Sequence, residues 1–197
     1  MGNEFGALEA AGVAVRFGPA VKVGSLRYFD AEGEFAGGLA ALLGGPIPAA
    51  LSASRRDLGD GSDVILVWRS PSEIWVVSGN SSCHAALERY AAGCAGGCFV
   101  EQTGGIVLLS VTGTQAVSLL SRLAAITAIP RPGQALSARF ADLGVTAVCL
   151  QPDQILLFIE RVYAAHVWAW IRATLADWPA NPGIAGATRL KEWDGSG

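Results

Sequence analysis

The sequence predicts an α+β protein built from two related β-α-β-β-α units, and an internal repeat is the main observation behind this prediction. The segment from Val64 to Val77, "VILVWRSPSEIWVV", matches a later segment from Val145 to Phe158, "VTAVCLQPDQILLF". Each copy is an apolar run, a short turn with one proline and a second apolar run, which is typical of a β-hairpin. Similar strand-like and helix-like segments flank both copies, so the repeat extends beyond the hairpin.

Upstream of each hairpin, the offset that places Val64 on Val145 also aligns a strand and then a helix. Residues 23–29 fall on residues 104–110, and both segments are predicted to be strands. Residues 34–43 fall on residues 115–124, and both are predicted to be leucine-rich helices. The glycines at 44 and 45 favour a helix end; an anion site in this glycine-rich stretch is the less favoured alternative.

Downstream of each hairpin, apolar residues recur at the spacing of one helix face. The two stripes are Cys83, Leu87, Tyr90 and Cys94 in the first copy, and Ala164, Trp168, Ile171 and Leu175 in the second. A further strand at 98–102 gives the first unit the β-α-β-β-α-β order of a ferredoxin-like unit. The second unit has "PANP" at 179–182 in the matching place, which does not suit an interior strand, so we expect it to be truncated or completed differently.

The expected organisation is therefore one compact body with short tails. It comprises an N-terminal tail (1–15), a first α+β repeat (16–103), a second repeat (104–178) and a C-terminal tail (179–197). The two repeats are expected to pack together as a pseudo-symmetric pair.

Composition indicates a protein that buries surface against partners. Hydrophobic residues make up 51% and charged residues 16%, against about 25% charged in an ordinary soluble domain. A membrane protein is excluded because no stretch of about 18 uncharged apolar residues occurs. Nucleic acid is not an expected partner, because the net charge is −3 and the basic residues are scattered. No secretory signal is recognisable, so we expect a cytoplasmic protein with reduced thiols.

No residue is predicted to be catalytic, to bind a cofactor or to bind a metal. The spacing of Cys94 and Cys98, with Cys83 and His84 nearby, superficially suggests zinc, but structural zinc sites favour tighter ligand pairs. Cys83 and Cys94 lie on the predicted core stripe, where cysteine serves as a small hydrophobe. The only two histidines, His84 and His166, have no carboxylate or nucleophile near them in sequence, so structural roles are favoured. We expect Ser81 or Ser82 to cap the helix that contains His84.

The turn "WRSPSEIW" at 68–75 has the reactive groups of an active site, but its second copy does not keep them. Ser72 and Glu73 become Asp153 and Gln154 in "CLQPDQIL", whereas the proline is shared. Shared turn chemistry with different reactive groups favours a structural turn over a catalytic corner.

The second long helix has an apolar outer side that the first helix lacks. This predicted surface contains Tyr163, His166, Val167 and Trp170, and the position of Trp170 is Arg89 in the first copy. We predict a subunit interface at these four residues. The alternative is that they pack against the first repeat or the C-terminal tail.

Several of these segments together resemble the gamma subunit of heterotetrameric sarcosine oxidase. That family has a W-L-G-P-D-E-W-like hairpin, an S-G-x-x-A strand end and a late R-S-x-A-x-x-x-W-x-W-like helix. The matching residues are Trp68, Pro71, Glu73 and Trp75, then Gly113 and Ala116, then Arg161, Ala164, Trp168 and Trp170. The resemblance covers about residues 36–176, and the sequence departs from the pattern at Ser70, Ser72 and Tyr163.

This resemblance implies a fold and a setting that the residues alone do not. The fold would be that of the folate-binding aminomethyltransferases (glycine-cleavage T protein). The chain would be a non-catalytic subunit beside alpha, beta and delta subunits that oxidatively demethylate sarcosine. FAD, FMN, NAD and tetrahydrofolate would lie in those partners, and none in this chain. The alternatives are the equivalent subunit of an N-methyl amino acid dehydrogenase, a stand-alone folate-binding or aminomethyltransferase-like protein, and a small-molecule-binding module.

Overall fold

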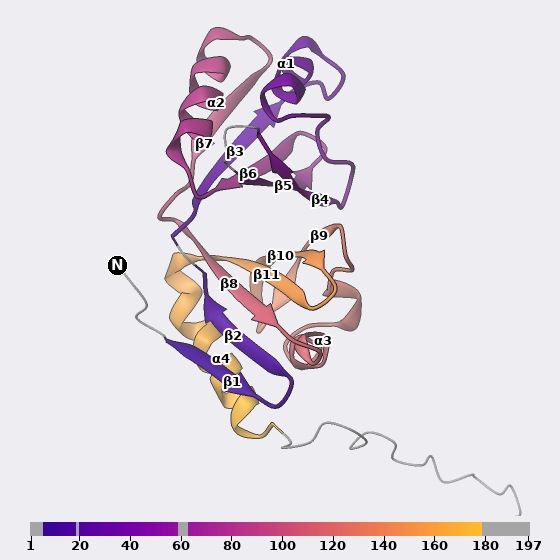
Figure 1. Cartoon of the computed structure of the whole chain (residues 1–197), viewed down its shortest axis with the longest axis vertical. Helices are drawn as coiled ribbons and strands as arrows, with labels where there is room; N and C mark the ends of the chain where they lie inside the picture. Colours follow the sequence, from indigo (N-terminus) through magenta and orange to yellow (C-terminus); the bar gives the residue numbers. More distant parts are fainter. Residues whose placement is uncertain (1–5, 19, 59–62, 179–197) are drawn as a thin grey trace, which may run out of the picture.

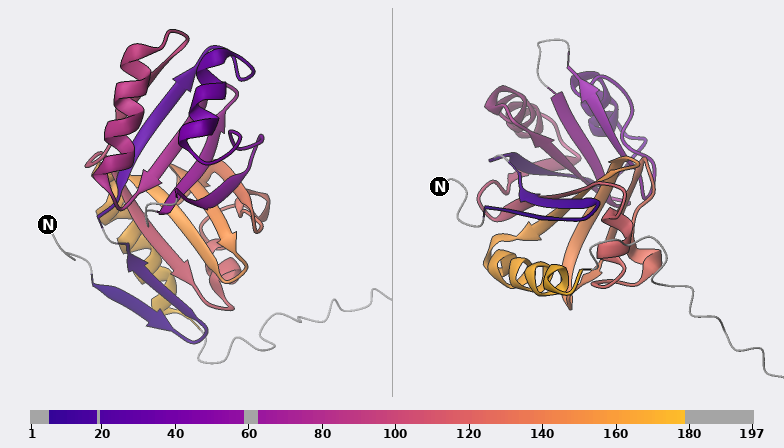
Figure 2. Two further views of the ribbon diagram at one scale, coloured as in Figure 1. Left: turned by 45° about the horizontal axis from the view of Figure 1, so that its top comes forward. Right: turned by 60° about the horizontal axis from the view of Figure 1, so that its bottom comes forward.

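The computed structural model describes residues 6–18, 20–58 and 63–178 (Figure 1). Two antiparallel sheets pack face to face, and each sheet carries helices on its outer face, so the molecule has four layers (Figure 2). One buried cluster lies between the sheets and one lies under the helices of each sheet. Each sheet is buried on both faces, which explains the nearly unbroken apolar runs of the central strands.

The first half of the molecule has the predicted β-α-β-β-α-β order plus one additional strand. Its elements are β3 (Lys22–Tyr28), α1 (Glu34–Leu42), β4 (Ala53–Asp57), β5 (Asp63–Ser70), β6 (Glu73–Ser78), α2 (Ser81–Gly93) and β7 (Gly97–Glu101). The strand order in this sheet is β4-β5-β6-β3-β7. Strand β4 escaped prediction because its sequence, "ASRRD", is short and charged, as suits an edge strand. Helix α1 ends as expected, with Gly44 at positive φ.

The second half repeats this arrangement. Its elements are β8 (Ile106–Thr112), α3 (Ala116–Leu120), η1 (Ile126–Ala128), β9 (Gln134–Phe140), β10 (Leu143–Gln151), β11 (Gln154–Glu160), η2 (Arg161–Tyr163) and α4 (Ala164–Ala176). Strand β9 is the counterpart of β4 and was likewise not predicted. Helix α3 is shorter than the predicted 115–124, because the chain turns after Leu120 and a 3-10 turn follows.

The N-terminal segment, predicted to be a tail over 1–15, instead forms β1 (Ala7–Ala10) and β2 (Val13–Phe17). Strand β2 pairs with β8, so the order in the second sheet is β1-β2-β8-β11-β10-β9. It occupies the place that β7 occupies beside β3 in the first sheet. The expectation that the second unit is completed differently is confirmed: its fifth strand comes from the N-terminal end of the chain. The predicted C-terminal tail lies outside the described residues.

The two hairpins share their register in detail. The pairing of β5 with β6 shifts between Trp68 and Ser70, and that of β10 with β11 shifts at the corresponding positions, Cys149 and Gln151. The predicted alignment of the preceding strands was wrong by four residues (108 − 104): Val23 pairs with Val77, and the counterpart of Val77, Phe158, pairs with Leu108 rather than with Gly104. Ser25 lies opposite Trp75, and Ser110 lies opposite the counterpart of Trp75 in β11, so β3 aligns with β8 at a larger offset than the hairpins do. The connections that follow β3 and β8 differ in length and account for the shift.

A close backbone contact docks the N-terminal hairpin onto the second half. Gly113 has a φ of +108°, and a Cβ there would lie 2.4 Å from the carbonyl oxygen of Gly12 in the β1–β2 turn. The amide of Gln115 donates to the same oxygen at 2.9 Å. Only glycine fits this position, which gives a structural reason for the "SVTG" motif at the end of β8.

Candidate functional site

The layer between the two sheets is filled at one end by a polar and aromatic cluster, here called the Arg69–Trp75 cluster. The Arg69 guanidinium lies 4.1 Å from the centre of the Trp75 ring and donates to the hydroxyls of Ser137 and Thr146 on the opposite sheet. The Trp75 ring meets Phe158 edge to face at a centroid distance of 6.0 Å. The guanidinium is a cation, and the electron-rich face of the indole attracts it. The two side chains therefore hold each other in place.

The carboxylate of Glu73 also lies at this end of the layer. Glu73 accepts a hydrogen bond from the Ser25 hydroxyl at 2.6 Å. Burial lowers the pKa of Arg69 from its ordinary value, and the nearby Glu73 carboxylate opposes this effect. Arg69 Nε and Trp75 Nε1 are buried without a hydrogen-bond partner in the described part of the chain. The stacked side chains of Arg69 and Trp75 fill this end of the layer.

At the other end of the same layer lies an open space of about 550 Å³, here called the intersheet cavity. Its apolar lining comprises Val21, Ile65, Val77, Leu108, Leu150 and Leu156. Ser110 and Gln154 add polar groups on one wall, and Arg55 pairs with Asp63 (Nε to Oδ2, 3.3 Å) among the lining residues. A volume of this size is in the range of small-molecule sites.

The intersheet cavity was not predicted from the sequence. A signal for it existed in the aligned hairpins. Trp75 of the first copy corresponds to Leu156 in the second, and Arg69 corresponds to Leu150. The first copy thus has two large side chains where the second has two smaller ones. This difference indicates that the space around the second pair is less completely filled.

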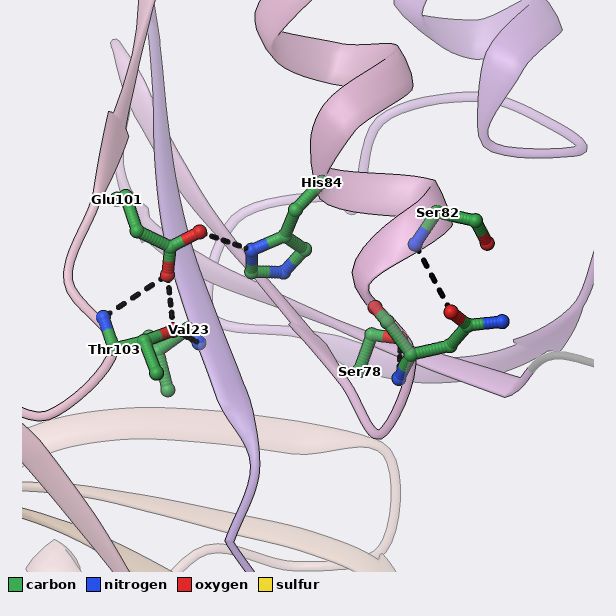
Figure 3. Close-up of polar contacts among 7 residues, drawn as sticks. Val23, Ser78, Ser82, His84, Glu101 and Thr103 are labelled. Carbon is green, nitrogen blue, oxygen red and sulfur yellow. Dashed lines mark hydrogen bonds and ion pairs between the residues drawn. The ribbon is translucent and has the colours of Figure 1, made fainter.

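A second polar group, formed by His84, Glu101 and Thr103, lies on the helix side of the first sheet (Figure 3). His84 extends from α2 toward β7, where its Nδ1 lies 2.8 Å from Glu101 Oε2. The Thr103 hydroxyl and amide both donate to the other carboxylate oxygen. The Phe99 ring packs edge to face against the imidazole, with 5.4 Å between centroids.

A histidine paired with a carboxylate is the arrangement of a base and its orienting group, but here the base is enclosed. The His84 side chain is 4% exposed, and its Nε2 is buried without a partner among the described residues. Partial burial raises the pKa of Glu101, yet hydrogen bonds from Thr103 and His84 outweigh it and hold this pKa below its usual range. The geometry favours the predicted structural role, in which the pair ties β7 to α2.

The start of α2 corrects one expectation about capping. Asn80, rather than Ser81 or Ser82, is the N-cap, and its Oδ1 accepts from the Ser82 amide at 2.9 Å. The Ser78 hydroxyl in turn accepts from the Asn80 amide at 2.9 Å. Ser78 and Asn80 also line the intersheet cavity, so this capped turn forms part of its wall.

Of the four residues predicted to form an interface on the last helix, three are exposed. Tyr163, His166 and Trp170 are exposed at spacings of three and four, which places them on one outer stripe, here called the α4 stripe. Trp170 is 47% exposed, and its ring lies 6.2 Å from that of His166. Val167 was assigned to this surface wrongly: it is 2% exposed and belongs to the core under the second sheet, because its position falls beside the Trp168 stripe.

The remaining candidates are the cysteines and the "WRSPSEIW" turn. Among the described residues, no group of three histidine, cysteine or acidic side chains is placed to hold a metal ion. None of the four cysteines forms a disulfide; Cys83 and Cys149 are buried, and burial raises the pKa of the Cys149 thiol. In the "WRSPSEIW" turn, the Ser72 amide donates to Ser70 Oγ. None of the described helices is long and apolar enough to cross a bilayer.

Comparison with protein-family models and with curated proteins gave no match. Solved structures, in contrast, share the fold. A chain of the heterotetrameric sarcosine oxidase from Corynebacterium sp. U-96, in complex with pyrrole 2-carboxylate, gives a TM-score of 0.77 at 19% identity over 90% of this chain and 91% of that one. Glycine cleavage system aminomethyltransferase T from Bartonella henselae gives 0.58 at 14% identity over 85% and 46%. The predicted aminomethyltransferase-like α+β fold is confirmed.

Proposed function

We propose that this chain is the non-catalytic gamma subunit of a heterotetrameric sarcosine-oxidase-type flavoenzyme complex. The observation that carries the proposal is the mutual coverage with the sarcosine oxidase chain, 90% in one direction and 91% in the other. Two chains of matching extent and fold are expected to occupy equivalent places in an assembly. The resemblance of the hairpin and late-helix motifs to the gamma family agrees with this placement.

In this proposal, the partners are alpha, beta and delta subunits in the cytoplasm. They carry FAD, FMN, NAD and tetrahydrofolate and perform the oxidative demethylation of sarcosine, which feeds tetrahydrofolate. This chain contributes binding surface. The α4 stripe supports such a role, because a half-exposed tryptophan beside an exposed tyrosine and histidine is the composition of an interface core.

Two alternative functions make predictions that differ from those of the proposed one. The equivalent subunit of an N-methyl amino acid dehydrogenase would assemble in the same way but with a different substrate. A stand-alone folate-binding or aminomethyltransferase-like protein would work without partners. Against the second rival, this chain matches only 46% of the aminomethyltransferase from Bartonella henselae.

Co-expression separates these functions. The chain is produced alone, and then together with candidate alpha, beta and delta subunits, with an affinity tag on this chain only. We expect a stable complex that carries flavin absorbance and oxidises sarcosine. A well-behaved monomer that binds tetrahydrofolate tightly and recruits no flavoprotein would contradict the proposal, and turnover of another N-methyl amino acid would favour the dehydrogenase.

Trp170→Arg tests the α4 stripe within that complex. The substitution gives α4 the residue that α2 has at the equivalent position, Arg89, and places a charge in the proposed contact. We expect at least a tenfold loss of assembly, or about 1.4 kcal/mol, measured by the fraction of flavoprotein retained on the tagged chain. Ile126→Arg, at another exposed apolar residue, is the matched control and should assemble normally. Equal retention by both variants would exclude the stripe as an interface.

A further inference from the structure

The intersheet cavity is the image of the Arg69–Trp75 cluster under the pseudo-symmetry of the two halves. The strand pairings set this correspondence, because β4, β5, β6 and β3 pair in the same order and register as β9, β10, β11 and β8. The cluster residues Trp75, Phe158, Arg69 and Thr146 thereby correspond to Leu156, Val77, Leu150 and Ile65. All four of these counterparts line the cavity. The space is therefore the place that an indole and a guanidinium fill at the other end.

The polar wall of the cavity is the counterpart of a hydrogen bond that the cluster uses. In the cluster, the Ser25 hydroxyl donates to Glu73. The corresponding pair in the cavity is Ser110 and Gln154, and both side chains face the space. Neither side chain forms a hydrogen bond to another described residue. A hydroxyl and a carboxamide can each donate and accept, so this wall presents a free hydrogen-bonding edge.

Charge argues for a neutral occupant. The cationic group of the cluster, Arg69, is replaced by Leu150 in the cavity. The charged side chains of the lining, Arg55 and Asp63, pair with each other and are both more than half exposed. The interior therefore offers apolar side chains without an unpaired charge, and a charged ligand would lose hydration without compensation.

We propose that the intersheet cavity binds a neutral, planar heteroaromatic molecule of one or two rings. The ring plane lies between Leu156 and Val77, where Trp75 and Phe158 meet at the other end of the layer. The polar edge of the ring hydrogen-bonds to Ser110 and Gln154. This site would act beside the subunit role and does not depend on it.

Indole is the probe, because it is the ring of Trp75. The full-length chain, alone or within its complex, is titrated with indole, and binding is followed by ligand-observed saturation-transfer NMR. We expect saturable binding with a Kd below about 1 mM, which is reasonable for nine non-hydrogen atoms. Benzoate, which is planar but anionic, is expected to bind at least tenfold more weakly.

Leu156→Trp is the decisive variant, because it fills the cavity with the side chain that the other hairpin carries. It should weaken indole binding at least tenfold, whereas Val117→Trp, at an exposed site on α3, should leave it unchanged. Gln154→Leu keeps the shape and removes the carboxamide, and should weaken binding about threefold to tenfold. If Leu156→Trp does not fold, Leu150→Phe narrows the same space from the neighbouring strand.

Two results would overturn the inference: no saturable indole binding up to about 5 mM, or binding that neither cavity-filling variant reduces. These outcomes are separate from those of the assembly experiment. A chain that assembles with a flavoprotein but does not bind indole contradicts only the ligand site. A chain that binds indole but recruits no partner contradicts only the subunit role.

Discussion

The two ends of the intersheet layer have the same backbone and opposite contents. At one end Arg69 lies over Trp75 and reaches across to hydroxyls of the opposite sheet; at the other, Leu150 and Leu156 stand at the corresponding positions and leave a cavity. Both hairpins keep their bulge and register in spite of this. The difference shows that backbone pairing and turn chemistry specify the duplicated fold, while side-chain size decides whether each end is closed or open.

The fifth strand of each half provides a second comparison. In the first sheet, Glu101 of β7 lies opposite Gly24 and contacts α2 through His84. In the second sheet, Phe17 of β2 occupies the equivalent place, and its ring lies 5.1 Å from that of Trp168 on α4. The same junction between strand and helix is polar in one half and aromatic in the other. At this junction a titratable pair joins strand to helix in the first half, and an aromatic pair does so in the second.

Trp75→Leu should have the largest effect, because it makes the closed end resemble the open one. The variant loses the ring contacts with Phe158 and Arg69 and leaves the guanidinium over a void. We expect a loss of about 3 kcal/mol in the free energy of unfolding, measured by chemical denaturation. Val117→Leu, on the exposed surface of α3, is the control. A loss under about 1 kcal/mol would mean that the closed end relaxes into a form like the cavity.

Gly113→Ala tests how the N-terminal hairpin completes the second half. The new Cβ meets the Gly12 carbonyl oxygen, and the backbone is left-handed at this residue. We expect a loss of about 2 kcal/mol and faster hydrogen exchange in β1 and β2 than in β7. Gly37→Ala is matched, because its Cβ would meet nothing within 4 Å, and it should be neutral or slightly stabilising. Unchanged exchange in β1 and β2 would show that this contact does not hold the hairpin.

Glu101→Gln should have the smallest effect: it lowers stability above pH 4.5, and its difference from the wild type shrinks in acid. The pKa of Glu101 lies below its ordinary value of 4.5 in the folded chain. Its contribution to stability is therefore present above that value and is lost as pH falls through the lower, folded-state pKa. The variant should lose less stability on acidification below pH 4.5, followed by thermal denaturation across that range. Glu88→Gln, on the exposed side of α2, should retain the wild-type dependence of stability on pH. If the wild type and both variants lose stability in parallel, Glu101 does not contribute to the acid sensitivity.

Sequence reasoning succeeded where the deciding contacts are local. The hairpins, the end of α1 and the stripe of Trp168 and Ile171 follow from alternation, turn residues and helical spacing. It failed for β4, because a short and charged strand lacks the apolar alternation that identifies strands. It also failed for Val167, because a shift of one residue around a helix separates the buried face from the exposed one. The alignment of β3 with β8 was wrong because a fixed separation ignores loops of different length.

What the sequence by itself determined is the duplicated β-α-β-β-α pattern, because each hairpin and helix is specified by residues a few positions apart. The tertiary structure decided that β2 completes the second sheet, that His84 meets Glu101, and that one end of the intersheet layer is open. Those outcomes depend on contacts between segments far apart in the chain, such as that of Arg69 with Thr146. Periodicity carries no information about such pairs; only the packing of one sheet on the other brings them together.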